Sequence, residues 1–308
     1  MCPLCLRGLN FSFVFLWFIL FFNNHAINIQ TVKYPSPQEV SMTAVVSPDY
    51  AALDIPRILS VLFHPRPEMH SLPVSPPSCD IMIPVAADVS IGARFHLNNP
   101  DGANILFFHG NGEIVADYND LGPLYNRMDI NFLVVDYRGY GLSGGTPTVS
   151  AMMQDCRVIF KFAHKWLKEN SYHGPLIVMG RSLGSASALE LACRHKEEIG
   201  ALIVESGFAQ AGPLLRLLGV DPQAIGFNEK AGFQNIEKIK VFDKPTLIIH
   251  AEFDHIIPYS DGKSLYAACA SEDKTLLKIP DANHNDIFMR GLQEYLAAVK
   301  ALVSKIGG

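Results

Sequence analysis

The chain has 308 residues, of which 49% are hydrophobic and 18% charged, so it contains enough apolar material for the core of one large domain. Its 25 lysines and arginines against 30 aspartates and glutamates give a formal net charge of −5. Because the basic residues are scattered and form no stripe, the composition argues against nucleic acid as a partner and favours a small neutral or weakly charged substrate.

Residues 1–41 are predicted to form an apolar N-terminal segment. Within it, residues 11–22 read FSFVFLWFILFF, which is shorter than the ~20 residues that usually cross a bilayer, and no clear small-x-small cleavage site follows. Three interpretations remain open: a signal peptide, a short membrane anchor with Cys2 and Cys5 as candidate acylation sites, or sequence upstream of a true start at Met42. We favour the last, which would make the protein cytoplasmic; the other two would make it secreted or membrane-associated.

Residues 42–90 are predicted to form a wrapping arm or edge structure, ahead of a main domain that spans residues 91–308. Prolines are concentrated in this arm, in stretches such as HPRPE and SLPVSPPSCD. Proline lacks a backbone N–H donor and disfavours long helices, so neither a core helix nor a central strand is expected here.

From residue 91 onward, short apolar segments alternate with helix-like ones. The predicted strands cover residues 91–97, 104–109, 131–136, 176–180, 201–205, 246–250 and 275–279, and the main predicted helices cover residues 150–169, 182–195, 260–270 and 286–306. Continuous apolar runs such as NILFF and LIVM suit strands that are buried on both faces of a parallel sheet. The alternation predicts an α/β fold with a mostly parallel central sheet and helices on both faces. In such sheets the ligand site lies beyond the carboxyl ends of the strands.

The strongest motif is Gly180-Arg181-Ser182-Leu183-Gly184, which joins a predicted strand to a predicted helix. A GxSxG sequence in this strand–turn–helix context is typical of a nucleophilic serine. The turn is so tight that a side chain at either glycine would collide with neighbouring backbone, and it presents the Ser182 hydroxyl above the sheet. The alternative is that Ser182 merely caps the helix, but the context favours the nucleophile.

A serine hydroxyl needs a base to take its proton, and the base needs an acid to fix its tautomer. Of the 11 histidines, His284 is best placed, because it lies between the last predicted strand and the final helix. Asp254 follows the penultimate strand and completes a serine–acid–histidine order. Asp281 and Glu205 are rival acids. Glu205 is the serious one, since a neighbouring strand end also reaches towards the base, but we favour Asp254.

Acyl transfer passes through an oxyanion that needs preorganised N–H donors. The backbone of Leu183, directly after the serine, is one predicted donor. The other is the backbone N–H of Asn111 in the sequence HGNGE, where His109 and Gly110 are expected to support a close approach of the backbone to the substrate. An ordinary glycine turn is the alternative interpretation of this loop.

Two further segments are predicted to have a structural role and no part in the chemistry. Asp136 and Arg138, in DYRGYG, are predicted to pair locally and hold their loop. Residues 206–244 are short for a lid and are expected to form at most a couple of small helices. Four leucines in this segment either face the substrate or, as we favour, pack on the body of the domain: Leu214, Leu215, Leu217 and Leu218.

The motifs HGNGE, DYRGYGLSGG, GRSLGSASALE, HAEFDHIIP and PDANHND resemble, in this order, the landmark motifs of the α/β-hydrolase superfamily. The likeness covers the chain from about residue 91 to its end. It is greatest to the serine hydrolases of the α/β-hydrolase domain-containing type, which include thioesterase-like and monoacylglycerol-lipase-like enzymes. This resemblance implies an α/β-hydrolase fold with a small lid, a catalytic domain over residues 91–308, and a triad of Ser182, Asp254 and His284.

The sequence therefore predicts a serine hydrolase that cleaves a carboxylic ester or thioester through a covalent acyl-enzyme. A peptidase or amidase of the same fold, and a non-catalytic binding protein, are the alternatives. No cofactor is expected, because no dinucleotide-binding or P-loop motif occurs. No metal is expected either, because the one CxxC pair, Cys2 and Cys5, has no second pair to complete a zinc site.

Overall fold

The computed structural model describes residues 49–69 and 78–307, which all belong to one compact unit, Val46–Gly308. The apolar run at residues 11–22 and the candidate start at Met42 lie outside the described residues. Among the residues that are described, no helix is both long and apolar enough to cross a bilayer.

In the described part of the chain, eight strands form one sheet in the order β1-β2-β4-β3-β5-β6-β7-β8. The strands are β1 (Ser78–Ala86), β2 (Val89–His96), β3 (Asn104–Phe108), β4 (Asn131–Val135), β5 (Leu176–Arg181), β6 (Ala201–Glu205), β7 (Thr246–Ala251) and β8 (Lys274–Ile279). Strand β2 runs antiparallel to β1 and β4, and all other neighbours are parallel. The predicted α/β fold with a mostly parallel sheet is confirmed.

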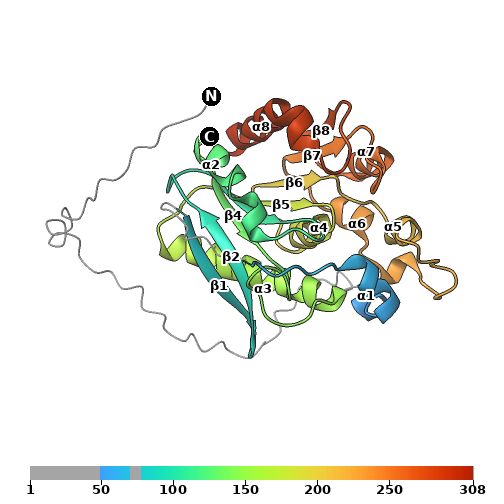
Figure 1. Ribbon diagram of the computed structural model, residues 1–308. Helices are drawn as coiled ribbons and strands as arrows, with labels where there is room; N and C mark the ends of the chain where they lie inside the picture. The colour runs from blue at the N-terminus through green and yellow to red at the C-terminus, as the bar shows by residue number, and fades with distance from the viewer. Residues whose placement is uncertain (1–48, 70–77, 308) are drawn as a thin grey trace, which may run out of the picture. The chain divides into compact units, whose positions relative to one another are not determined.

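Helices cover both faces of this sheet (Figure 1). They are α1 (Pro56–Leu62), α2 (Leu121–Asn126), α3 (Val149–Glu169), α4 (Gly184–Arg194), α5 (Ala211–Leu217), α6 (Asn235–Ile239), α7 (Tyr259–Ala268) and α8 (Ile287–Ile306), with 3₁₀ turns η1 (Tyr50–Leu53), η2 (Val115–Tyr118) and η3 (Glu229–Ala231). Helices α2 and α8 pack on one face, and α3, α4, α6 and α7 pack on the other.

The apolar runs of the central strands supply both cores. In β3, Ile105 and Phe107 point into the core under α2 and α8, whereas Leu106 and Phe108 point into the core under α3 and α4. All four side chains are fully buried. Because successive side chains of a strand alternate between faces, a strand covered on both sides must be apolar throughout, which explains the sequence NILFF.

The edge hairpin β1–β2 joins residues on both sides of the boundary predicted at residue 91. Strand β2 begins at Val89, and β1 lies entirely within the Pro-rich region, paired in register with β2 so that Ile83 faces Ile91. Strand β1 pairs with β2 only, and at such an edge Pro84 removes no ladder hydrogen bond that a further strand would need. The arm therefore supplies one strand of the sheet.

The described part of the arm before β1 is tied to the helical layer. The Tyr50 hydroxyl donates to Glu190 on α4 at 2.8 Å. The Asp54 carboxylate accepts the backbone N–H of Val149, the first residue of α3, at 2.7 Å. Since the first N–H groups of a helix have no partners within it, Asp54 joins the N-cap Thr148 in satisfying them.

The segment between β6 and β7 forms a small cover of short helices. It contains α5, η3 and α6 and no long insertion, which agrees with the predicted small lid. Leu214 and Leu215 are buried in the main core, and Leu218 packs against that core while partly exposed. Leu217 is 54% exposed. Three of the four leucines therefore pack on the body, as the favoured interpretation expects.

Candidate active site

Ser182 lies in a strained turn between β5 and α4. Its φ of +50° falls in the left-handed region, which a residue with a Cβ adopts only when the surrounding structure enforces it. Its backbone N–H donates to the Glu205 carbonyl at the end of the neighbouring strand β6, at 2.9 Å. This bond fixes the height of the turn above the sheet.

The glycines on either side of the serine are required by close backbone contacts. A Cβ on Gly180 would lie 2.2 Å from the Gly184 carbonyl oxygen, and a Cβ on Gly184 would lie 2.1 Å from the carbonyl oxygen of Phe108 at the end of β3. Both distances are far below van der Waals contact. The second contact also shows that the end of β3 lies against the turn of residues 180–184, which we call the serine turn. The oxyanion-loop candidate, residues 109–113, begins at this same end of β3.

We expect Gly184→Ala to lower the free energy of unfolding by about 1–3 kcal/mol, the usual range for overpacking, because the clashing Phe108 carbonyl belongs to a central strand that cannot move alone. Urea unfolding monitored by circular dichroism would measure the change. Gly144→Ala is the matched control: its Cβ would meet no atom within 4 Å, so a shift beyond about 0.5 kcal/mol is not expected. An unchanged midpoint for Gly184→Ala would show that the turn is looser than described.

His284 stands between Ser182 and Asp254. It lies in the loop between β8 and α8, with Nε2 3.0 Å from the Ser182 Oγ and Nδ1 2.7 Å from the Asp254 Oδ2. A carboxylate has no proton to give, so Nδ1 carries the ring proton and donates to Asp254. The lone pair of Nε2 is then free to accept the proton of the Ser182 hydroxyl.

Asp254 follows β7 and is held by its own loop. Its Oδ1 accepts the backbone N–H groups of Ile256 and Ile257, at 3.0 and 2.8 Å, while its Oδ2 faces His284. Burial alone would raise the pKa of Asp254, but the hydrogen bond from His284 and the electrostatic attraction between the two side chains outweigh it and hold that pKa below its usual range. The carboxyl group is therefore ionised at neutral pH.

A second histidine, which the sequence analysis did not single out, supports the acid loop. His250 is fully buried at the end of β7 and its Nε2 donates to the Ile257 carbonyl at 2.8 Å. The same nitrogen lies 3.6 Å from the Asp254 Oδ2. Burial lowers the pKa of His250, so its ring is neutral and adds no competing positive charge beside the carboxylate.

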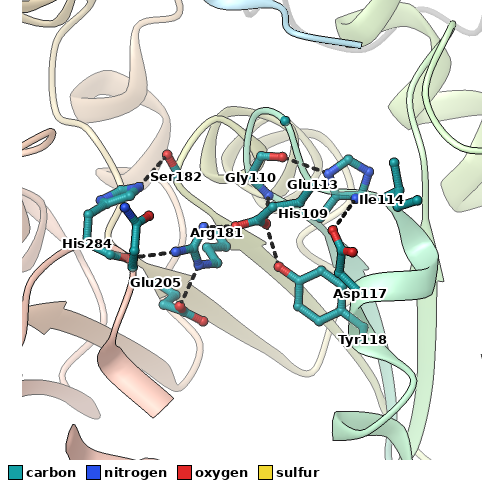
Figure 2. Close-up of polar contacts among 12 residues, drawn as sticks. His109, Gly110, Glu113, Ile114, Asp117, Tyr118, Arg181, Ser182, Glu205 and His284 are labelled. Atoms are coloured by element: carbon teal, nitrogen blue, oxygen red, sulfur yellow. Dashed lines mark hydrogen bonds and ion pairs between the residues drawn. The ribbon is translucent and has the colours of Figure 1, made fainter. Parts of the chain in front are cut away.

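The rival acids do not contact the base side chain. Glu205 is fully buried, but its Oε1 accepts from Arg181 Nε at 3.0 Å and its Oε2 accepts from the Tyr295 hydroxyl at 2.8 Å. Figure 2 shows the Glu205 carboxylate directed at the guanidinium, not at the imidazole. Asp281 is exposed, and its backbone N–H donates to Glu252. The geometry therefore pairs His284 with Asp254.

The oxyanion-loop candidate is anchored through the side chain of Asn111. Its Oδ1 accepts from the His64 backbone N–H at 2.8 Å and from the Tyr140 hydroxyl at 2.7 Å, and its Nδ2 lies 2.7 Å from the His64 Nδ1. Among residues 49–69 and 78–307, no acceptor takes the backbone N–H of Asn111 or of Leu183. Both predicted donors thus remain available, next to the serine turn.

His109 lies at the base of this loop, with its Nδ1 2.8 Å from the Gly110 carbonyl oxygen. The His109 imidazole is buried, with Nε2 3.1 Å from the Asp136 Oδ1. The predicted pairing of Asp136 with Arg138 is wrong. Arg138 instead binds Asp155 on α3 through Nε and Nη2, at 2.7 and 2.8 Å. The helix brings a carboxylate into bidentate reach, whereas Asp136 turns inward to the histidine.

In the part of the chain that the structure describes, no group of three or more His, Cys, Asp or Glu side chains is arranged to hold a metal ion. The polar groups that meet beyond the carboxyl ends of β3, β5, β7 and β8 are a hydroxyl, an imidazole, a carboxylate and backbone N–H groups. These are the components of nucleophilic acyl transfer with a general base.

Comparison with known proteins agrees with this fold. The chain is 31% identical over 209 residues to human alpha/beta hydrolase domain-containing protein 17B, an alignment that covers 65% of this chain and 66% of that protein. The chain belongs to the α/β-hydrolase superfamily. It spans just under two thirds of the length of the curated relatives that it matches; a second is Escherichia coli YfhR, 29% identical over 187 residues that cover 60% of this chain and 64% of that protein.

Within the α/β-hydrolase superfamily, the family model described as serine aminopeptidase, S33, matches residues 99–224, which include the oxyanion-loop candidate and the serine turn. Among solved structures, the Pyrococcus furiosus esterase Pf2001 matches with a TM-score of 0.62 at 17% identity, covering 80% of this chain and 98% of that one. A monoglyceride lipase from Saccharomyces cerevisiae, in complex with a substrate analogue, matches with a TM-score of 0.58 at 18% identity and covers 78% and 98%. These structures establish the shared fold.

Proposed function

We propose that this protein is a serine hydrolase that cleaves a carboxylic ester or thioester, with Ser182 as nucleophile, His284 as general base and Asp254 as the acid. The observation that carries the proposal is the continuous relay from Ser182 Oγ to His284 Nε2 at 3.0 Å and from His284 Nδ1 to Asp254 Oδ2 at 2.7 Å. Nucleophile and base are within hydrogen-bond reach, and the base is oriented by a third group, which is the arrangement that activates a serine.

The reaction then proceeds in two steps. His284 takes the hydroxyl proton as Ser182 attacks the acyl carbonyl, and the backbone N–H groups of Asn111 and Leu183 stabilise the oxyanion of the tetrahedral intermediate. The Asp254 carboxylate stabilises the imidazolium that forms. His284 next protonates the leaving alcohol or thiol, leaving an acyl group on Ser182. Water, activated by the same imidazole, releases the acid and restores the enzyme.

The substrate class is supported by the proteins that share the fold. One is named an esterase and another is a monoglyceride lipase in complex with a substrate analogue. The serine aminopeptidase family model supports amide hydrolysis as a second candidate. An ester or thioester is favoured because an alcohol or thiol departs more readily than an amine, so the same triad cleaves these bonds over a lower barrier.

A panel of chromogenic substrates tests the proposal. We expect hydrolysis of p-nitrophenyl esters or of acyl thioesters with an optimum at one acyl length, together with covalent labelling of Ser182 by a fluorophosphonate. Aminoacyl p-nitroanilides report the aminopeptidase alternative in the same assay. If Ser182 is labelled but only the anilides are cleaved, the ester assignment is wrong. If no substrate is cleaved and no label is taken up, the protein is a binding protein with a hydrolase fold.

A further inference from the structure

A buried ionic network links the loops of the site beneath the triad (Figure 2). At its centre is Arg181, the residue directly before the nucleophile, with only 7% of its surface exposed. Its three nitrogens contact three separate parts of the chain: the end of β6, the loop after β3 and the loop before α8. Nε donates to Glu205 at 3.0 Å, Nη1 pairs with Glu113, and Nη2 donates to the backbone carbonyl of His284 at 2.6 Å. The guanidinium therefore contacts the main chain of the catalytic base itself.

Glu113 carries the connection onward to the oxyanion-loop candidate. Its Oε1 faces Arg181, while its Oε2 accepts the backbone N–H of Gly110 at 2.6 Å and the Tyr118 hydroxyl at 2.5 Å. Gly110 directly precedes Asn111, whose N–H is the proposed oxyanion donor. A Cβ on Gly110 would lie 2.7 Å from the Arg181 Nη1, so the loop rests against the guanidinium.

The pair of Arg181 and Glu113 is charged at neutral pH. Burial would lower the pKa of the Arg181 guanidinium, but its acidic neighbours outweigh burial and raise that pKa. Burial would raise the pKa of Glu113, but Arg181 and the Tyr118 hydroxyl outweigh it, so that pKa lies below its usual range and the carboxylate stays ionised. The planar guanidinium has donors in a rigid fork, so each of its contacts also fixes a direction. A lysine side chain has one nitrogen and cannot bind the two loops and the end of β6 in this geometry.

A second buried charge cluster, around Glu190, lies away from the site and serves for comparison. Glu190 on α4 pairs with Lys238 and accepts from the Tyr50 hydroxyl, all three being buried, but none of its partners belongs to a loop of the site. Buried ion pairs contribute little net stability, because desolvation offsets their attraction. Stability therefore does not explain why Arg181 contacts the base loop and the oxyanion loop together.

We propose that Arg181 and Glu113 are positioning residues, which hold the His284 loop and the Gly110–Asn111 peptide in register with Ser182. The proposal rests on the proposed serine-hydrolase function and adds residues that act through the triad and not on the substrate. Displacing a catalytic group by about 1 Å costs on the order of 100-fold in rate. Loss of the pair is thus expected to slow the chemical step and leave substrate binding nearly unchanged.

Glu113→Gln and Arg181→Lys test this proposal. Glu113→Gln keeps the size of the side chain and removes its charge, whereas Arg181→Lys keeps the positive charge and removes the planar fork. Fluorophosphonate titration counts the competent active sites, so that kcat is expressed per labelled serine. We expect kcat to fall about 10- to 100-fold with KM changed less than about threefold, since the loss falls on the transition state. Binding of a trifluoromethyl ketone, whose adduct with the serine carries an oxyanion, is expected to weaken by a similar factor.

Glu190→Gln is the matched control, because it removes a buried paired carboxylate that touches no loop of the site. It is expected to alter thermal stability while kcat per labelled serine stays unchanged. A purely structural role for Arg181 and Glu113 would give that same behaviour in their variants, and this result would overturn the proposal. If Glu113→Gln does not fold, Arg181→Lys carries the test. If the wild-type protein has no hydrolase activity, the proposed function is overturned together with this proposal. The wild-type assay comes before any variant, so this outcome is distinguished from a failure of the positioning role alone.

Discussion

Ser182→Ala is expected to abolish ester hydrolysis almost completely, lowering kcat by roughly 10⁴- to 10⁶-fold, the range seen when a triad nucleophile is removed. The hydroxyl that His284 Nε2 faces at 3.0 Å is the atom that forms the acyl-enzyme, and alanine has nothing to replace it. The fold should be unaffected. Serine and alanine both have a Cβ, so the strain at φ +50° is the same for either residue.

The measurement is kcat on the best p-nitrophenyl ester, with circular dichroism to verify folding. Ser187→Ala is the matched control. Ser187 is a fully buried serine on α4, the helix that follows the serine turn, and its hydroxyl has no hydrogen-bond partner among the described residues, so its removal should leave kcat within about twofold. Hydrolysis that survives in Ser182→Ala would place the nucleophile elsewhere.

The central strands were predictable because their burial on both faces confines polar residues to the strand ends, as with Asn104, Asn131 and Glu205. Strand β6 occupies residues 201–205 as predicted, since ALIV is continuous and the next element begins only after Glu205. The long helix predicted over residues 150–169 begins at Val149, one residue earlier, where Thr148 provides the N-cap. Strand β1 was not predicted as a strand, because it contains a proline and half of its side chains face solvent.

The site was predictable only where a motif fixes a residue type for a chemical reason. In GxSxG the serine is specified by its chemistry and the two glycines by backbone clashes, but the motif does not specify the residue between Gly180 and Ser182. Arg181 occupies that position, and its partner Glu113 closes the HGNGE motif 68 residues earlier. The only signal in the sequence was that each of the two motifs, GRSLG and HGNGE, contains one charged residue of opposite sign. Pairing them requires knowing that β3 and β5 are neighbours in the sheet.

Proximity in the sequence was also a poor guide to ion pairing. Arg138 lies two residues from Asp136, yet its partner is Asp155, 17 residues away on α3. Residues that follow a strand at positions i and i+2 share a direction only while the chain stays extended, and here the chain turns after Val135. For the same reason, position in the sequence alone did not decide whether Asp254 or Glu205 pairs with His284. Glu205 ends β6 and Asp254 lies in the loop after the neighbouring strand β7, so only the path of that loop decides which carboxylate reaches the base.

Asp254→Asn is expected to lower kcat by roughly 10³- to 10⁴-fold, a large loss but smaller than that of Ser182→Ala. The asparagine amide can donate to the His284 Nδ1, which favours the tautomer with its proton on Nε2. That nitrogen then cannot accept the proton of the Ser182 hydroxyl. The Oδ1 contacts to the backbone of Ile256 and Ile257 need no charge, so an asparagine oxygen can keep them and the loop should stay folded.

Glu205→Gln is the comparison that decides between the two acids. Its Oε1 and Oε2 accept from Arg181 and Tyr295 and do not touch the imidazole, so we expect kcat to fall by no more than about tenfold, through the loss of one charge-assisted hydrogen bond. Both variants are compared at saturating ester, per labelled serine. If Glu205→Gln loses more activity than Asp254→Asn, then Glu205 is the acid that acts on His284. The 2.7 Å contact between Asp254 and His284 would then belong to a resting arrangement that the reaction does not use.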